Sequence, residues 1–194
     1  MKRKRCAEEE EEDVVAGLYV YSLNNHVYFN ADVTTETMFR LCKELRTVAH
    51  ELKSKAMHQQ PIYLHVSTSG GDVSAAFSCV DCIQSLGTPV YSVVDGFVAS
   101  AGTLITLAAD KRYIQPNAYM LIHQVSSGVW GKMSVIHEQV GNLKKLMDHL
   151  TQFYLDHTNL KAKVLNQLLL TDVEWNAQEC IAKGIVDELY PINP

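Results

Sequence analysis

The stretch Asp95-Gly96-Phe97-Val98-Ala99-Ser100-Ala101-Gly102 places one serine among small residues, between an expected strand and an apolar helical run. Small neighbours allow another group to approach the serine closely. A second glycine turn, Ser67-Thr68-Ser69-Gly70-Gly71-Asp72, also follows an expected strand and precedes a helical run. Because both turns join a strand to a helix, they can face one another.

Hydrophobic periodicity predicts alternating strands and helices around these two turns. Strands are expected at 62–66 and 90–94, and helices at 73–86 and 101–109. Such a βαβα order implies parallel strands joined by right-handed crossovers. The sequence therefore predicts an α/β fold. The other expected strands cover 18–21, 26–29, 113–114 and 119–122, and the other expected helices begin at 35 or cover 161–170 and 177–183.

A long helix is expected after His123, because apolar residues recur there in alternating steps of three and four. This heptad seam consists of Met133, Ile136, Val140, Leu143, Met147, Leu150 and Tyr154. One interpretation is a helix that lies on its own sheet. The other is a projecting helix whose seam is filled by another subunit.

Composition limits the classes of function and the cellular location. The 194 residues carry a formal net charge of -5, which argues against broad phosphate binding, so no nucleic-acid partner is expected. The longest apolar run, 97–109, is shorter than the ~20 residues of a membrane span, so it is interpreted as a buried core helix and no membrane association is expected. Five cysteines without a signal segment favour a reduced, cytoplasmic setting.

The amino terminus differs in composition from the rest of the chain. A basic block at 2–5 and an acidic block at 8–13 contain no apolar anchor. Segments of this kind do not bury enough apolar surface to order themselves. The sequence predicts a disordered charged tail at 1–16 and a single domain at 17–194.

Three polar residues suggest nucleophilic catalysis. Ser100 is a poor nucleophile unless a base removes its proton, and His123, at the end of the expected strand 119–122, is the candidate base. Asp172 follows a helix and is the candidate for orienting the imidazole, while backbone N–H groups of the two glycine turns could hold an oxyanion. A serine between alanines is also a common packing choice. The order Ser, His, Asp differs from that of α/β-hydrolases.

The remaining histidines and cysteines suggest packing roles. The other histidines do not repeat a metal-ligand spacing, and Cys79-Val80-Asp81-Cys82 lies inside an expected helix without a second cysteine pair. No lysine follows the glycine turn, so it is no phosphate loop. The sequence predicts neither a metal site nor a cofactor site.

The residues resemble the proteolytic subunit family of the Clp protease, ClpP. The matching segments are Ser69-Gly70-Gly71, Gly96 to Ser100, Pro116-Asn117 with Ile122-His123-Gln124, and Asp172 with Gly184-Ile185-Val186-Asp187. The resemblance covers about residues 18 to 190. It implies that Ser100 is the nucleophile, His123 the general base and Asp172 the orienting carboxylate, with the backbone N–H groups of Gly71 and Ala101 forming the oxyanion hole.

The same resemblance implies a crotonase-like ββα fold with the long helix as a projecting handle. It implies a serine endopeptidase acting inside a homo-oligomeric ring, a heptamer or a stacked tetradecamer, on peptides and unfolded proteins. Substrate would lie as an added strand beside the segment 124–132. The subunit itself would need no cofactor; ATP would act only through a separate unfoldase partner, a Clp-type AAA+ ATPase.

Two other functions remain open from the sequence. An enoyl-CoA hydratase or isomerase relative would hold an enolate with two similar backbone N–H groups, but it would not need the Ser, His and Asp set. A catalytically silent structural ring subunit would keep the fold and not the chemistry. The three polar residues at Ser100, His123 and Asp172 favour the peptidase.

Overall fold

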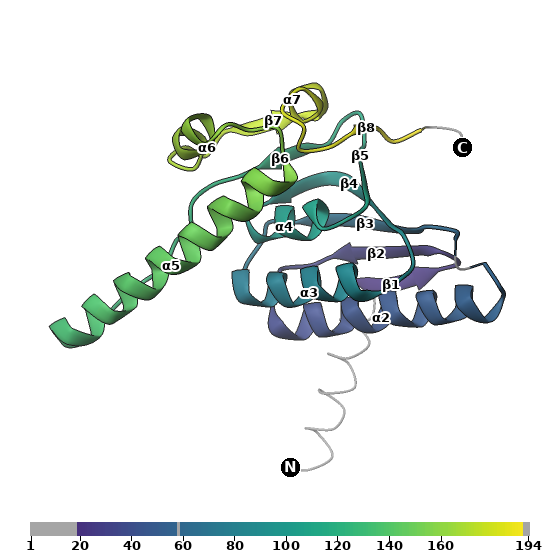
Figure 1. The fold of residues 1–194 in the computed structure, drawn as a ribbon, viewed down its shortest axis with the longest axis horizontal. Helices are drawn as coiled ribbons and strands as arrows, with labels where there is room; N and C mark the ends of the chain where they lie inside the picture. The colour runs from purple at the N-terminus through teal and green to yellow at the C-terminus, as the bar shows by residue number, and fades with distance from the viewer. Residues whose placement is uncertain (1–18, 58, 192–194) are drawn as a thin grey trace, which may run out of the picture.

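The computed structural model describes residues 19–57 and 59–191, so the predicted tail at 1–16 lies outside the described residues. The described chain is a mixed α/β structure (Figure 1). Its strands are β1 (Val20–Leu23), β2 (His26–Asn30), β3 (Ile62–Thr68), β4 (Val90–Ala99), β5 (Lys111–Ile114), β6 (Tyr119–Leu121), β7 (Glu174–Asn176) and β8 (Glu188–Leu189). Its helices are α2 (Thr35–Ser54), α3 (Val73–Ser85), α4 (Ala101–Leu107), α5 (Met133–His157), α6 (Ala162–Leu168) and α7 (Ala177–Ala182).

The strands form one sheet in the order β1-β2-β3-β4-β5-β8, with β6 and β7 attached to β4. The β1–β2 hairpin is antiparallel and turns at Asn24, whose φ of 56° suits an asparagine. From β2 to β8 every pair along this path is parallel. The predicted parallel pairing of the two central strands is thus confirmed.

Strand β4 is longer than the sequence suggested, and it changes partner along its length. Tyr91 to Val94 pair with β5, whereas Phe97 to Ala99 pair with β6. The change occurs at Gly96, whose φ of 66° is accessible to glycine without strain. The predicted end of the strand at Val94 was therefore wrong, as was the assignment of 97–99 to a helix.

Three helices cover one face of the sheet and enclose the core. Helices α2, α3 and α4 lie side by side along the strands (Figure 1). Helix α2 begins at a capping box in which Thr34 and Thr37 exchange side-chain to backbone hydrogen bonds. Its buried side, including Leu41 and Leu45, follows the predicted helical period. Helix α4 is buried at every position, as a core helix requires.

Helix α5 leaves the body of the molecule. Its last turns pack on the chain's own core through Leu150, Phe153 and Tyr154, whereas its first turns extend away from the sheet in Figure 1. Met133 is 68% exposed and Val140 is 40% exposed. The first interpretation of the seam thus holds only for the carboxyl-terminal turns.

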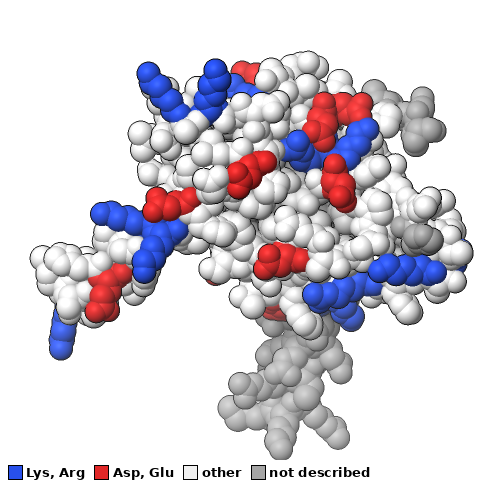
Figure 2. All heavy atoms as spheres, in the orientation of Figure 1, with Lys and Arg blue, Asp and Glu red and all other residues white. Residues whose placement is uncertain are grey.

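Charges are mixed on the face seen in Figure 2. Lysine and arginine side chains lie among aspartate and glutamate side chains over the body and along the projecting helix. Within residues 19–57 and 59–191, every helix is too short or too polar to cross a bilayer.

Candidate active site

Ser100 stands alone between β4 and α4. Its φ of 54° and ψ of -127° form a conformation that residues other than glycine rarely adopt. Its N–H donates to the carbonyl of Leu121 in β6 at 2.9 Å, and its carbonyl accepts from the backbone N–H of Thr103 at 3.0 Å. Half-buried Ser100 is the single residue between the strand and the helix. The two hydrogen bonds therefore hold its backbone on both sides.

The two glycine turns meet at Ser100. A Cβ atom on Gly70 would lie 2.6 Å from the Cβ of Ser100, so only glycine permits this approach. Gly71 lies beside Val33 in an isolated parallel bridge. Among the described residues, the N–H groups of Gly71 and Ala101 donate no hydrogen bond, so both remain available to a ligand oxygen.

His123 and Asp172 are brought together by a strand pairing that local sequence does not reveal. Strands β6 and β7 are antiparallel, with Leu121 opposite Glu174. Extending this register by two residues sets His123 opposite Asp172. Nδ1 of His123 lies 3.0 Å from Oδ1 of Asp172, and the carboxylate accepts a hydrogen bond from the Nδ1–H group. This arrangement leaves Nε2 of His123 free to act as a base.

Ser100 and His123 follow neighbouring parallel strands at the same edge of the sheet. Ala99 in β4 pairs with Leu121 in β6, so Ser100 is one residue past this pair and His123 two. No hydrogen bond joins their side chains in the described chain. Catalytic hydrogen bonds are often longer in ligand-free enzymes than in complexes. Of the polar site residues, the structure thus joins His123 to Asp172 directly, and Ser100 follows the strand next to the one that precedes His123.

A family model described as Clp protease matches residues 9–192. The chain belongs to the Clp protease family. This membership confirms the resemblance inferred from the sequence.

Curated relatives carry the same family name. The chain is 33% identical over 132 residues to "ATP-dependent Clp protease proteolytic subunit 2" of Treponema denticola, an alignment that covers 67% of this chain and 66% of the relative. It is 34% identical over 132 residues to the protein of the same name from Treponema pallidum, again with 67% and 66% covered. The chain thus matches about two thirds of the length of these curated relatives.

A cavity of about 390 Å³ lies near the first glycine turn of this Clp family member. Ser67 to Ser69, Asn30 and Phe97 are among its lining residues. Ser100, His123 and Asp172 do not line it. The described residues hold no group of three or more His, Cys, Asp or Glu side chains that could bind a metal ion.

The four cysteine thiols within the described residues are buried and belong to the core. Cys79 and Cys82 are free and lie with Cys42 between α2 and α3. A hydrogen bond with Cys79 and burial raise the pKa of Cys42 to about 12, and burial raises the pKa of Cys180 to about 12. Because the thiolate is the nucleophilic form, the raised pKa and burial make Cys42 and Cys180 poor nucleophiles.

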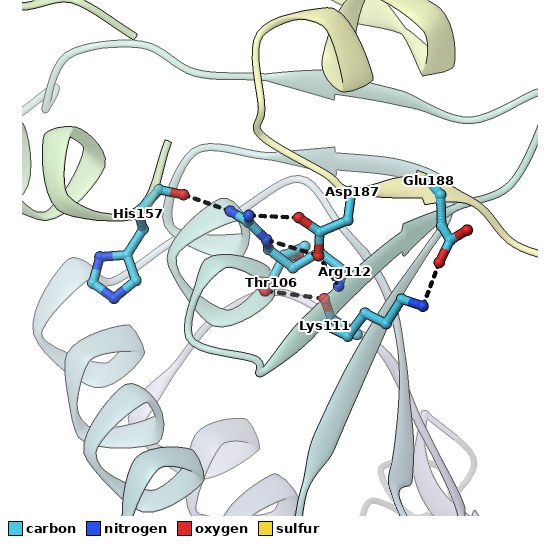
Figure 3. A network of polar contacts seen from close by, with 7 residues as sticks. Thr106, Lys111, Arg112, His157, Asp187 and Glu188 are labelled. Atoms are coloured by element: carbon cyan, nitrogen blue, oxygen red, sulfur yellow. Dashed lines mark hydrogen bonds and ion pairs between the residues drawn. The ribbon is translucent and has the colours of Figure 1, made fainter. Parts of the chain in front are cut away.

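The Gly-Ile-Val-Asp segment has a structural role at the end of the long helix. The guanidinium of Arg112 in β5 donates to Asp187 at 2.7 Å and to the carbonyl of His157 at the end of α5 (Figure 3). The backbone N–H of Arg112 also donates to Asp187, at 2.8 Å. Asp187 and Arg112 thus hold the last turn of α5 against the sheet.

One polar cluster was missed by the sequence interpretation, which assigned His65 to packing. His65 is 7% exposed, and its Nδ1 lies 2.8 Å from Oδ2 of Asp95. Its Nε2 lies 3.0 Å from Nδ1 of His26. The alternation of side chains along β3 signals that His65 shares a face with Tyr63, but no local signal indicates the histidine pair.

Proposed function

We propose that this chain is a serine endopeptidase subunit of a Clp-type compartmentalised protease. The observation that carries the proposal is the His123–Asp172 hydrogen bond of 3.0 Å beside a serine held at a φ of 54°. Membership of the Clp protease family supports the same chemistry. Two available N–H groups, on Gly71 and Ala101, lie on the turns that meet at Ser100.

The proposed mechanism uses only groups of this chain. Oγ of Ser100 attacks the peptide carbonyl carbon while Nε2 of His123 takes the hydroxyl proton, and Asp172 stabilises the resulting imidazolium. The carbonyl oxygen becomes an oxyanion that accepts hydrogen bonds from the N–H groups of Gly71 and Ala101. The C–N bond then breaks, the amine leaves with the proton from His123, and an ester on Ser100 remains. Water, activated by His123, hydrolyses this acyl-enzyme and restores the serine.

The proposal extends to assembly, in accordance with the crotonase-like fold that the resemblance implies. The exposed first turns of α5 would act as the handle between copies in a homo-oligomeric ring, a heptamer or a stacked tetradecamer. Substrate would add as a strand beside residues 124–132, which form no regular element of their own. Folded proteins would require a separate AAA+ ATPase to unfold them, and the subunit itself would use no cofactor.

The deciding experiment is covalent labelling of the purified protein with a fluorophosphonate, combined with hydrolysis of a fluorogenic peptide. Ser100→Ala should abolish both signals and leave the fold intact. Ser85→Ala is the matched control, because its hydroxyl binds only the carbonyl of Cys82 within its own helix. Labelling that persists in Ser100→Ala would contradict the proposal. A protein with neither signal would instead be the silent ring subunit.

A further inference from the structure

A chain of two hydroxyl groups runs from α5 to the backbone of Ser100. The hydroxyl of Thr103 donates to the carbonyl of Ser100 at 2.7 Å. The same hydroxyl lies 2.6 Å from the phenol oxygen of Tyr154. Thr103 is fully buried, and Tyr154 is 1% exposed. No solvent competes for these hydrogen bonds, and buried polar groups that lose their partners are costly.

The direction of each hydrogen bond follows from the protons available. A threonine hydroxyl has one proton, which Thr103 gives to the Ser100 carbonyl. The phenol of Tyr154 must then be the donor to Thr103. Burial raises the pKa of Tyr154 well above its ordinary value, so the phenol keeps its proton at physiological pH. The phenol of Tyr154 therefore donates to the hydroxyl of Thr103, which donates to the carbonyl of Ser100.

The carbonyl of Ser100, which accepts the last of these hydrogen bonds, belongs to the peptide unit that also carries the N–H of Ala101. The carbonyl of Ser100 and the N–H of Ala101 are parts of one planar group, so fixing the carbonyl also fixes the direction of the N–H. It also fixes ψ of Ser100, which at -127° with a positive φ is strained. Strained conformations persist only where several contacts hold them.

We propose that Thr103 is a positioning residue that aims the Ala101 N–H and the Ser100 side chain, and that Tyr154 of α5 orients Thr103. The inference rests on the proposed function, since it assigns Ser100 and Ala101 their roles in the reaction. It adds two residues that touch neither substrate nor the reacting atoms. Through them, the carboxyl-terminal turns of α5 contact the peptide that would stabilise the oxyanion.

Thr103→Val tests the first step, because valine has the same shape and no hydroxyl. The second-order rate constant for fluorophosphonate labelling of Ser100 should fall about tenfold, the effect of losing roughly one hydrogen bond of transition-state positioning. The kcat for peptide hydrolysis should fall by a similar factor with KM unchanged. Thr103→Ser restores the hydroxyl and should stay within about twofold of wild type.

Thr106→Val is the matched control on the same helix. Thr106 lies about one turn further along α4 than Thr103 and is equally buried. Its hydroxyl donates to the carbonyl of Gly102 at 3.3 Å. The Thr106→Val variant should react with the fluorophosphonate at the wild-type rate. Equal rates for Thr103→Val and Thr106→Val, or a Thr103→Ser variant as slow as Thr103→Val, would overturn the inference.

Tyr154→Phe tests the second step and removes only the phenol oxygen. Its labelling rate should fall about threefold, because Thr103 retains its hydrogen bond to Ser100 but loses its own support. The double variant Thr103→Val with Tyr154→Phe should be no slower than Thr103→Val alone, since both act through one hydroxyl. Additive losses of labelling rate in the double variant would overturn the proposed order of hydrogen bonds from Tyr154 to Thr103 to Ser100.

Failure of the inference and failure of the proposed function give different results. Labelling that survives Ser100→Ala contradicts the function itself, whatever Thr103 does. Labelling that requires Ser100 but is unaffected by Thr103→Val overturns only the positioning role. If Thr103→Val does not fold, Thr103→Ser and Tyr154→Phe decide the matter, and a wild-type rate in Tyr154→Phe then counts against the inference.

Discussion

Gly70 and Ser100 approach so closely that a Cβ atom on Gly70 would lie 2.6 Å from the Cβ of Ser100. The same atom would lie 2.8 Å from the carbonyl oxygen of Ala99, which is rigid backbone within β4. Gly70 also has a φ of 98°, where a side chain is strained. The first glycine turn and the serine turn therefore depend on each other for their geometry.

Gly70→Ala should consequently destabilise the fold by about 2 kcal/mol or more and greatly slow the labelling of Ser100. Urea denaturation and the labelling rate measure the two effects. Gly141→Ala is the control, since nothing lies within 4 Å of its added Cβ and alanine favours a helix. A Gly70→Ala variant as stable and reactive as wild type would show that the contact is readily relieved.

Asp172→Asn tests the partner of His123. Asparagine can donate an N–H toward Nδ1, which favours the imidazole tautomer that has no lone pair on Nε2. Although the Asp172 side chain is 77% exposed, its role depends on tautomer and orientation more than on burial. The expected loss in kcat is on the order of 10³-fold, with residual activity from the N–H groups of the glycine turns. Pre-steady-state hydrolysis of an ester substrate measures it.

The control for Asp172→Asn is Glu174→Gln, two residues further along the chain, in β7. Glu174 is exposed and pairs only through its backbone with Leu121. It should retain wild-type kcat. If Asp172→Asn also retains wild-type kcat, the hydrogen bond to His123 has no part in turnover.

Local sequence predicted many of the strands, turns and helices that carry the candidate site, because such elements follow from short patterns. Ser100 and His123 were identified by their places at the ends of apolar runs. The pairing of β6 with β7 could not be predicted, because the three residues of β7 are too few for their alternation to indicate a strand. Yet that pairing sets Asp172 opposite His123. Asp172 was identified by its place after a helix and by family resemblance, not by strand pairing.

Longer-range contacts explain what the sequence missed. Asp95-Gly96 is a local turn signal, but the pairing of Phe97 to Ala99 with β6 continues the strand through it. The Thr103–Tyr154 hydrogen bond joins residues 51 positions apart, and periodicity describes Tyr154 only as a seam residue. Contacts of this kind depend on how two elements pack, which local patterns do not encode.

Leu143→Glu tests the role of the long helix in assembly. The first turns of α5 expose Met133 and Val140, and an isolated subunit would leave this stripe in water. A carboxylate in the partly buried seam position of Leu143 should shift the protein to smaller species in analytical ultracentrifugation. Lys144→Glu is the control, because it introduces the same group at a neighbouring exposed position outside the seam. Wild-type protein that is already monomeric would contradict the ring.

The His26–His65–Asp95 cluster predicts a specific dependence of stability on pH. Burial, and secondarily the neighbouring His65, lower the pKa of His26 below its ordinary value of 6.5. His26 also stacks on Tyr63 with ring centroids 4.9 Å apart. Between the lowered pKa and about 6.5 the unfolded chain binds a proton at this residue that the folded chain does not. The contribution of neutral His26 to stability is therefore complete above about 6.5 and is lost as the pH falls through the lowered pKa.

His26→Gln removes this titration and keeps a side-chain donor toward His65. The free energy of unfolding should therefore fall less steeply between about pH 7 and pH 5 in His26→Gln than in wild type. His65 and Asp95 are present in both proteins, so the difference between the two curves reports the titration of His26 and its electrostatic coupling to His65. Urea denaturation at a fixed protein concentration measures these curves, because assembly would otherwise change the apparent stability.

His50→Gln is the matched control, as His50 is exposed on α2 and makes no ring contact among the described residues. Parallel curves for wild type and His26→Gln would show that His26 binds protons equally in the folded and unfolded chain.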